Sequence, residues 1–418
     1  MPQNEPFYSE KQRFRQWWLW LLILILSPIG LFVFIWATFQ QVIMESPIGN
    51  NPTSDFVLII LGLIFGFVIL VALVGVLFFT WLHASTLRVK EIESATFVNL
   101  TDVPTLKSGQ KIKVLTWNIQ FLAGNQNNHF FFDGGKDTWP SITTRKKVLN
   151  QITEVIITER PDIVLLQEVD DGAKRTEYED QLTELLALLP KEYGNHASTF
   201  YWQANFVPHP ALMGSVGMKL STISKYQITQ ATRYALTGIP SQSWIVQQMN
   251  PKRAILEVQL PIKNSGTLIV MNTHLSAFVQ SSNTMEIQVD QVKNLMARWQ
   301  TQQYHPVIFG GDFNLLPSSF AYNLLDIKGK SYYNPNGTEL SPMLQAFESI
   351  PSLESMNGDD HAKWFTYSPN HIGPAVADRT IDYLFYTTNL TLVEHKVRSE
   401  DTLMTSDHLP VISVFTLP

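Results

Sequence analysis

Six short clusters of acidic, amide and imidazole side chains follow runs of apolar, largely β-branched residues in this chain. The clusters are Trp117-Asn118, Gln167-Glu168, Asn272-Thr273-His274-Leu275, Gly310-Gly311-Asp312-Phe313-Asn314, Ile381-Asp382-Tyr383 and Ser406-Asp407-His408. Taken singly, each has an ordinary explanation: Asn118 could cap a turn, Glu168 could be a solvated charge, and His274 could be a hydrogen-bonded core residue. Together they would place many polar groups beside buried strands, which costs free energy unless those groups pair or bind a cation. The set therefore indicates a catalytic or metal site.

The residue types in these clusters restrict the chemistry. The chain contains no cysteine, which excludes disulfides, thiolate metal sites and a cysteine nucleophile. Carboxylate, carboxamide and imidazole groups favour a hard cation, Mg²⁺ or alternatively Mn²⁺. His274 and His408 can move protons near neutral pH. The net charge of −6 lacks the positive balance of proteins that grip nucleic acid through its phosphates, although bound cations would add positive charge locally.

The apolar pattern predicts the elements that must position these clusters. Short β-branched runs predict buried strands at 113–117, 162–166, 267–272, 307–310, 381–386 and 410–415. Apolar residues at helical spacing predict one helix that begins near Arg145 and stops at Pro161, and another around 292–299. Several strands follow one another without a helix between them, which favours an α/β sandwich over a doubly wound sheet.

In this order the clusters resemble the motif series of the endonuclease/exonuclease/phosphatase superfamily: WN, QE, NTHL, GGDFN, IDY and SDH. The resemblance runs from Trp117 to His408 and covers essentially the whole chain after its apolar N-terminal part. It implies a four-layered α/β sandwich, in which two packed mixed sheets are flanked by helices and the site lies at one end of the sheets.

The resemblance also implies a metal site for phosphodiester hydrolysis. Glu168 resembles the principal metal ligand, with Asn118 beside it and Asp407 completing or flanking the site. A phosphodiester gains negative charge in the transition state, which a cation and aimed hydrogen-bond donors stabilise. The expected cofactor is Mg²⁺.

Five further residues receive catalytic roles from the same resemblance. His408 resembles the general base, held by Asp382 through a carboxylate–imidazole hydrogen bond, and Asp312 lies where the family orients or deprotonates the attacking water. Asn314 is expected to hold the phosphoryl group, and His274 to bind phosphate or protonate the leaving oxygen. The choice of base between His408 and Asp312 stays open. So does the partner of His274, for which some family members supply a second carboxylate.

Two long apolar segments precede this predicted domain. Residues 17–39 and 56–81 carry no charge, and each exceeds the roughly 20 residues that a helix needs to cross about 30 Å of hydrocarbon. Tryptophans near their ends are typical of interfacial anchors. A pair of buried core helices is the alternative that the sequence favours least.

The distribution of basic residues predicts the orientation of these segments. Lys and Arg occur before the first segment and after the second, whereas 40–55 has neither, which places both ends in the cytoplasm. The predicted organisation is a two-helix transmembrane hairpin in 1–85, a linker in 86–110 and a cytoplasmic catalytic domain in 111–418. Two alternatives stay open: a re-entrant hairpin that does not fully cross the bilayer, and a short edge strand of the domain at 97–103. The protein is thus expected to be an integral membrane protein with the lipid bilayer as a partner.

Fold alone does not decide the substrate. Inositol-lipid phosphatases of the superfamily carry a Trp-Cys-Asp-Arg element, whereas this chain has Ala377-Asp378-Arg379-Thr380. The two apolar segments resemble the layout of membrane-bound neutral sphingomyelinases, and His274-Leu275-Ser276-Ala277 loosely resembles their His-Leu-Gln-Ala element. The sequence favours a phospholipid or sphingolipid headgroup diester over the alternative, a membrane-anchored DNA or RNA nuclease. A scaffold without activity is disfavoured because every motif position is chemically competent.

An aromatic loop follows the first site strand. It contains Phe130, Phe131, Phe132 and Trp139. Its side chains could enter a bilayer interface, stack on bases or pack onto the domain itself, and packing is slightly favoured.

Overall fold

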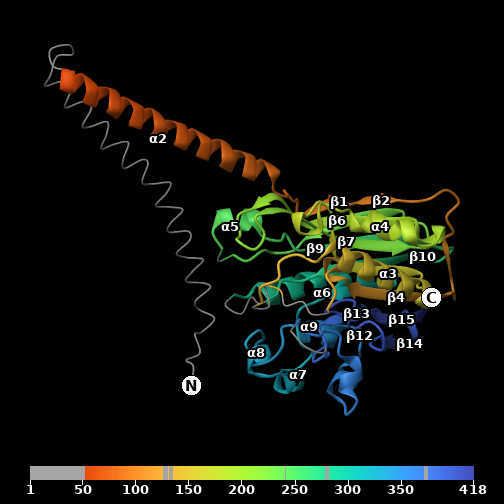
Figure 1. Cartoon of the computed structure of the whole chain (residues 1–418). Helices are drawn as coiled ribbons and strands as arrows, with labels where there is room; N and C mark the ends of the chain where they lie inside the picture. The colour runs from red at the N-terminus through yellow and green to blue at the C-terminus, as the bar shows by residue number, and fades with distance from the viewer. Residues whose placement is uncertain (1–51, 126–129, 131–134, 241, 278–281, 371–374) are drawn as a thin grey trace. The chain divides into compact units, whose positions relative to one another are not determined.

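The computed structural model describes residues 52–125, 130, 135–240, 242–277, 282–370 and 375–418 (Figure 1). The chain divides into two compact units, Met1–Ser85 and Thr86–Pro418.

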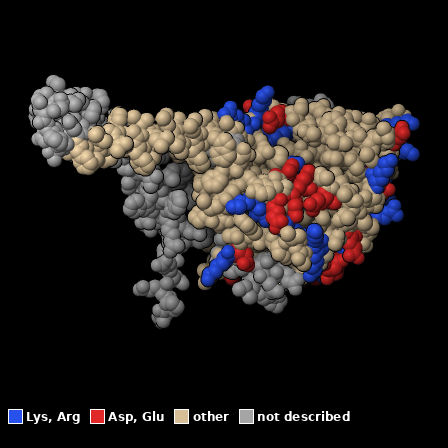
Figure 2. Space-filling model, turned by 45° about the horizontal axis from the view of Figure 1, so that its top comes forward, with Lys and Arg blue, Asp and Glu red and all other residues tan. Residues whose placement is uncertain are grey.

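The described part of the first unit is one long helix, α2 (Pro52–Ser85). Its segment Ile59–Trp81 is, among the described residues, the one helix long and apolar enough to cross a membrane by length and composition. This segment carries no charged residue and is tan in the space-filling view (Figure 2). The other expected segment, 17–39, lies outside the described residues, so the two-helix hairpin stays a prediction.

The second unit contains two mixed β-sheets. The seven-stranded sheet has the order β14 (Thr391–Val397), β15 (Val411–Thr416), β4 (Lys111–Asn118), β5 (Ile163–Asp170), β7 (Gly214–Ser224), β6 (Asn195–Val207) and β2 (Thr96–Val98). The eight-stranded sheet has the order β1 (Ile92–Ser94), β8 (Gln230–Ala235), β9 (Ala254–Lys263), β10 (Gly266–His274), β11 (Val307–Asp312), β13 (Asp382–Tyr386) and β12 (Glu348–Ile350), with β3 (Leu106–Lys107) beside β9. Each of the six predicted strands overlaps one of these.

The sheets pack face to face between two layers of helices (Figure 1). Alternation along β4 shows how: Ile112 and Val114 belong to the cluster between the sheets, while Leu115 and Trp117 pack outward against a helix. Helices α3 (Ile142–Glu159) and α4 (Gln181–Leu188) cover the seven-stranded sheet, and α6 (Thr284–Gln303) and α9 (Ser341–Ala346) cover the other. The predicted α/β sandwich is confirmed. Shorter helices are α5 (Trp244–Met249), α7 (Ser319–Leu324), α8 (Ile327–Lys330) and α10 (Leu353–Asn357).

Helix α3 illustrates how local sequence sets an element. The Ser141 hydroxyl accepts a hydrogen bond from the Thr144 amide, a cap that contributes about 1 kcal/mol. Apolar residues between Val148 and Ile156 pack on the sheet. Arg160 adopts the left-handed conformation directly before Pro161 and ends the helix.

Residues 86–110 are predicted to be a linker in which 97–103 could form a short edge strand, and the structure has three short strands in this segment. These residues supply β1 and β2 at the outer edges of the two sheets, and β3 beside β9. Leu106 is fully buried, and the Asn99 side chain bonds the main-chain oxygen and nitrogen of Ile228 at 2.7 and 3.0 Å. The polar composition that suggested a linker belongs to edge strands, which keep one side in solvent.

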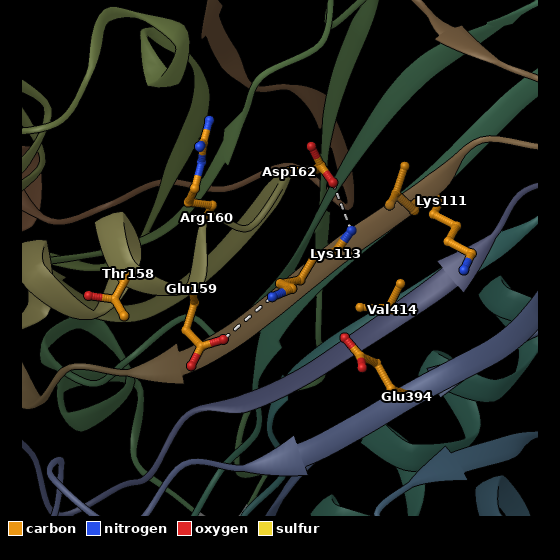
Figure 3. A pocket seen from close by; sticks show the side chains of 9 residues that line it. Lys111, Lys113, Thr158, Glu159, Arg160, Asp162, Glu394 and Val414 are labelled. Atoms are coloured by element: carbon orange, nitrogen blue, oxygen red, sulfur yellow. Dashed lines mark hydrogen bonds and ion pairs between the residues drawn. The ribbon is translucent and has the colours of Figure 1, made fainter.

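A pocket lies at the amino-terminal ends of β4 and β5, away from the polar clusters at their other ends (Figure 3). Two contacts join residues that line it. Lys113 Nζ lies 3.5 Å from Glu159, and the Lys113 main-chain N–H donates to Asp162 at 2.8 Å. These contacts join α3 to the sheet, and we give the pocket a structural role.

Candidate active site

The predicted site residues stand where strands from both sheets end. β4 and β5 are parallel neighbours in one sheet, and β10 and β11 are parallel neighbours in the other. Strand register sets His274 opposite Asp312, and Asp312 opposite Asp382. Main-chain pairing therefore brings three side chains from three strands together.

Two backbone features aim the side chains at this end. Glu168 has φ +57°, and the register of β5 against β7 shifts between Leu166 and Val169. Such a bulge redirects a side chain, and a left-handed conformation outside glycine costs about 1 kcal/mol. At Gly311 a Cβ atom would lie 2.0 Å from the Thr273 carbonyl oxygen, so only glycine permits this approach of β10 and β11.

His408 and Asp382 form a buried imidazole–carboxylate pair. Nδ1 of His408 lies 2.8 and 3.0 Å from the two Asp382 oxygens. The Trp117 indole N–H donates to the His408 main-chain oxygen at 2.8 Å, and the Tyr367 ring packs 4.9 Å from the imidazole. The ring is thereby held with Nε2 towards the centre of the site, 3.6 Å from Asp312.

A second set of contacts joins the two sheets at the same point. The Asn118 Nδ2 donates to Asp312 at 3.0 Å and to Glu168 at 3.2 Å. His274 Nε2 lies 3.3 Å from Asp312, and its Nδ1 lies 3.9 Å from Glu168. Asp312, which is 1% exposed, thus lies at the centre of the cluster.

The remaining two predicted residues extend this network. Asp407 lies 4.0 Å from His408 Nε2 and accepts a hydrogen bond from Asn370 at 3.0 Å. The Asn314 main-chain N–H donates to Asp312 at 2.9 Å. All eight predicted site residues therefore lie in one connected cluster; their individual roles stay proposals.

Burial and like charges shift the pKa values in the cluster. Burial raises the pKa of Asp312, and the charges of Asp382 and Glu168 add to the rise while His408 opposes it. Burial lowers the pKa of His274 well below its usual range. Burial would also lower the pKa of His408, but the carboxylates of Asp382, Asp312 and Asp407 raise it well above its usual range.

The charge balance of the cluster fits a divalent cation. Among the described residues, no Lys or Arg forms an ion pair with Glu168, Asp312 or Asp382, and only histidines approach these three carboxylates within 4 Å as cationic partners. Oxygen and nitrogen donors without thiolate suit a hard ion. Asp312, Asp382 and His408 also lie close enough together to share an ion. Both Asp382 oxygens already face His408, and the side-chain oxygens of Glu168 and Asn118 could hold an ion instead.

Gln167 and Asn272 belong to the sequence clusters, but no role was predicted for them. Gln167 Nε2 donates to the Asn272 oxygen at 2.7 Å, and Asn272 Nδ2 donates to the main-chain oxygens of Leu166 and Ser221 at 3.0 Å. These amides connect the two sheets beneath the site. Two neighbours were missed: Asn370, which holds Asp407, and Tyr201, which contacts His274. Neither belongs to a recognisable motif, so only the fold reveals them.

The aromatic loop contributes less than its composition suggested. Phe130 is 1% exposed and packs on Phe121, with ring centroids 5.8 Å apart, so packing onto the domain is confirmed for this residue. Trp139 is 47% exposed and lies under Lys174. Phe131 and Phe132 lie outside the described residues.

Residues 115–408 match the Endonuclease/Exonuclease/phosphatase family. The match spans most of the chain and includes every cluster described above, and the chain belongs to this family. Its members are hydrolases of phosphoester bonds that depend on divalent metals.

Solved structures similar to this chain include an endonuclease/exonuclease/phosphatase from Beutenbergia cavernae, with 22% identity, 73% of this chain and 72% of that chain covered, and a TM-score of 0.48. The human Nocturnin catalytic domain with bound sulfate has 20% identity and a TM-score of 0.45, and the similarity covers 78% of this chain and 97% of that chain. TDP2 from Caenorhabditis elegans has 16% identity and a TM-score of 0.45, and the similarity covers 76% of this chain and 77% of that chain. No curated protein sequence matches the chain significantly.

Proposed function

We propose that this chain is a divalent-metal-dependent phosphodiesterase that acts on a phospholipid or sphingolipid headgroup at a membrane. The observation that carries the hydrolase is the buried cluster in which the His408–Asp382 pair faces Asp312 and Glu168. This arrangement combines a base held by a carboxylate with acidic groups that need a cation.

Each residue has a task in the proposed reaction. Glu168 and Asn118, beside Asp407, would hold a Mg²⁺ ion, whose positive charge would stabilise the phosphoryl group as its negative charge grows. His408 in its neutral form takes a proton from water at Nε2, and Asp382 stabilises the resulting imidazolium. A cation bound beside Asp312 and Asp407 would offset the carboxylate charges that raise the pKa of His408 and so favour this neutral form. We assign the base to His408 because its Nδ1 contacts a carboxylate at 2.8 Å.

Asp312, Asn314 and His274 complete the proposal. Asp312 orients the attacking water, since its Oδ2 lies 3.6 Å from His408 Nε2. Asn314 and His274 flank Asp312 and hold the phosphoryl oxygens. These three residues supply hydrogen-bond donors and acceptors to a phosphoryl group that binds between the two sheets.

The lipid substrate is proposed from the N-terminal part of the chain. Helix α2 is long and apolar enough to span a bilayer, and with residues 17–39 we propose that it forms a hairpin anchor with the catalytic unit in the cytoplasm. A tether raises the effective concentration of a lipid substrate and does nothing comparable for soluble nucleic acid. The net charge of −6 points the same way.

The test is a comparison of substrates on one preparation. Full-length protein in liposomes with Mg²⁺ is assayed for phosphate-headgroup release from phospholipids and sphingomyelin, and for cleavage of RNA and plasmid DNA. We expect lipid turnover, faster for the full-length protein than for the fragment 86–418 in solution. Efficient cleavage of DNA or RNA with no lipid cleaved under any metal condition would establish the nuclease alternative instead.

A further inference from the structure

His274 has a partner that is not a carboxylate. The phenol oxygen of Tyr201, on β6, lies 3.2 Å from His274 Nδ1, and the two rings lie 5.5 Å apart at 57°. Tyr201 is 1% exposed and His274 is 4% exposed. Water therefore has little access to this contact. Nδ1 also faces the Glu168 carboxylate, but at 3.9 Å that group lies beyond hydrogen-bond distance, whereas the phenol at 3.2 Å lies within it.

The contacts on the other ring nitrogen fix the direction of this hydrogen bond. His274 Nε2 lies 3.3 Å from Asp312 Oδ2. Above the raised pKa of Asp312 this carboxylate is ionised and only accepts hydrogen bonds. The proton of a neutral His274 therefore belongs on Nε2. Nδ1 then carries a lone pair, and the hydroxyl of Tyr201 donates to it.

The local backbone and one arginine hold Tyr201 in place. The register of β6 against β7 shifts between Phe200 and Trp202, so Tyr201 lies in an irregularity that turns its side chain towards the site. The Arg253 guanidinium lies 5.2 Å from the centre of the Tyr201 ring and donates to the His274 main-chain oxygen at 3.4 Å. Arg253 thus contacts both members of the pair.

We propose that Tyr201 is a positioning residue that holds His274 as the Nε2–H tautomer. The N–H that faces Asp312 in the structure would then donate to a phosphoryl oxygen when a substrate binds at the same point. The proposal deepens the proposed function and rests on it. A carboxylate in the same place would require the proton on Nδ1, so the phenol reverses which nitrogen of His274 is the fixed donor. This change of the donor nitrogen depends on one residue of β6, Tyr201, which has a phenol in place of a carboxylate.

The tautomer can be measured without an activity assay. Protein labelled with ¹⁵N-histidine gives long-range ¹H–¹⁵N correlations, and the His274 signals are those missing in His274→Gln. We expect the Nε2–H pattern in the wild type, and a downfield shift of the Nδ1 resonance in Tyr201→Phe because that nitrogen loses its donor. An Nδ1–H pattern in the wild type, or an Nδ1 resonance that Tyr201→Phe leaves unmoved, would overturn the proposal.

A double-mutant cycle tests whether Tyr201 acts through His274. With Mg²⁺ and bis(p-nitrophenyl) phosphate, Tyr201→Phe is expected to lower kcat/KM about tenfold, as loss of an outer-shell partner does. In the His274→Gln background the same substitution should have no further effect. An equal loss in both backgrounds would show a general structural role and contradict the proposal.

Tyr193→Phe is the matched control. Tyr193 is also buried, at 2% exposure, but its hydroxyl has no hydrogen-bond partner in the described part of the chain, so kcat/KM should stay at the wild-type value. A loss equal to that of Tyr201→Phe would contradict the proposal. If the wild type cleaves no phosphodiester at all, the proposed function fails, and the ¹⁵N spectra still decide the tautomer.

Discussion

At the scale of single residues, the account depends on which atoms face one another at Asp382, His408 and Asp312. Replacing Asp382 by Asn keeps the shape but puts an amide opposite Nδ1, which lies 2.8 Å from the carboxylate. The amide can present a donor where the imidazole needs an acceptor, so the wrong tautomer of His408 becomes accessible. We expect kcat to fall by at least about 100-fold, with the thermal midpoint little changed.

Asp401→Asn is the control for this substitution. Asp401 also pairs with a basic side chain, Arg398, but its side chain is 54% exposed and lies outside the cluster. Its loss should leave kcat at the wild-type value. Steady-state kinetics and thermal unfolding of both variants decide the point, and a fully active Asp382→Asn enzyme would remove His408 from the role of base.

The sequence identified this cluster because its residues occur in recognisable local motifs. Glu168 and Asp312 follow apolar strands, and the ends of neighbouring parallel strands meet in space. Tyr201 could not be found in this way. It lies in the middle of β6 among ordinary strand residues, and its importance depends on a contact with a residue 73 positions away. The left-handed backbone at Glu168 is equally invisible, because it depends on pairing with β7.

At the scale of elements, removal of the segment 86–110 tests the described fold. It covers the outer strands of both sheets, since β1 pairs with β8 and β2 with β6. We expect the fragment 86–418 to unfold cooperatively. We expect the fragment 111–418 to be less stable and to aggregate, because two unpaired strand edges and the contacts of buried Leu106 are exposed. Equal thermal midpoints and equal solubility of the two fragments would restore the view of 86–110 as a linker.

The end of α3 gives a pH-dependent prediction. Glu159 is 8% exposed and accepts from Lys396 at 2.8 Å and Arg398 at 2.9 Å, with Lys113 at 3.5 Å. Burial tends to raise the pKa of Glu159, but these three cations lower it below its usual value. A lowered folded-state pKa stabilises the fold above the unfolded pKa, and that stability is lost as pH falls through the folded pKa.

Glu159→Gln should therefore lower the free energy of unfolding by about 2 kcal/mol at pH 7. The difference from the wild type should persist down to about pH 5 and shrink below about pH 4. Denaturant unfolding of the fragment 86–418 across this range measures it. A difference that grows on acidification would contradict the assigned ion pairs.

The strands that end in the site clusters could be expected from local patterns, whereas several other strands could not. The predicted helix from Arg145 to Pro161 corresponds to α3, because its apolar spacing and its end signals agree. Strands β6 and β7 were not predicted. Polar residues such as Ser198, Thr199 and Gln203 interrupt the apolar pattern of β6, and the strand is stabilised by its long antiparallel pairing with β7.

At the scale of the whole molecule, the proposed membrane anchor leads to a prediction about orientation. Basic residues outside the two apolar segments, and their absence from 40–55, predict a cytoplasmic catalytic unit. Reporter fusions after Pro418 and within 40–55 should report opposite sides of the membrane. A C-terminal reporter that is active only outside the cytoplasm would contradict the orientation and remove the lipids of the inner leaflet as substrates.

The central claim is a metal-dependent phosphoester hydrolase centred on Glu168, and one measurement tests it most directly. Phosphodiester turnover is followed for the full-length protein and for Glu168→Gln, with Mg²⁺ and with EDTA, together with the thermal midpoint of each. Glu168 Oε1 lies 3.2 Å from Asn118 Nδ2 at the centre of the site, and the substitution keeps its shape while removing the charge that holds a hard cation. We predict that EDTA abolishes wild-type turnover, that Mg²⁺ restores it, and that Glu168→Gln loses most turnover at a nearly unchanged midpoint. Full activity in EDTA, or an undiminished Glu168→Gln enzyme, would contradict the account.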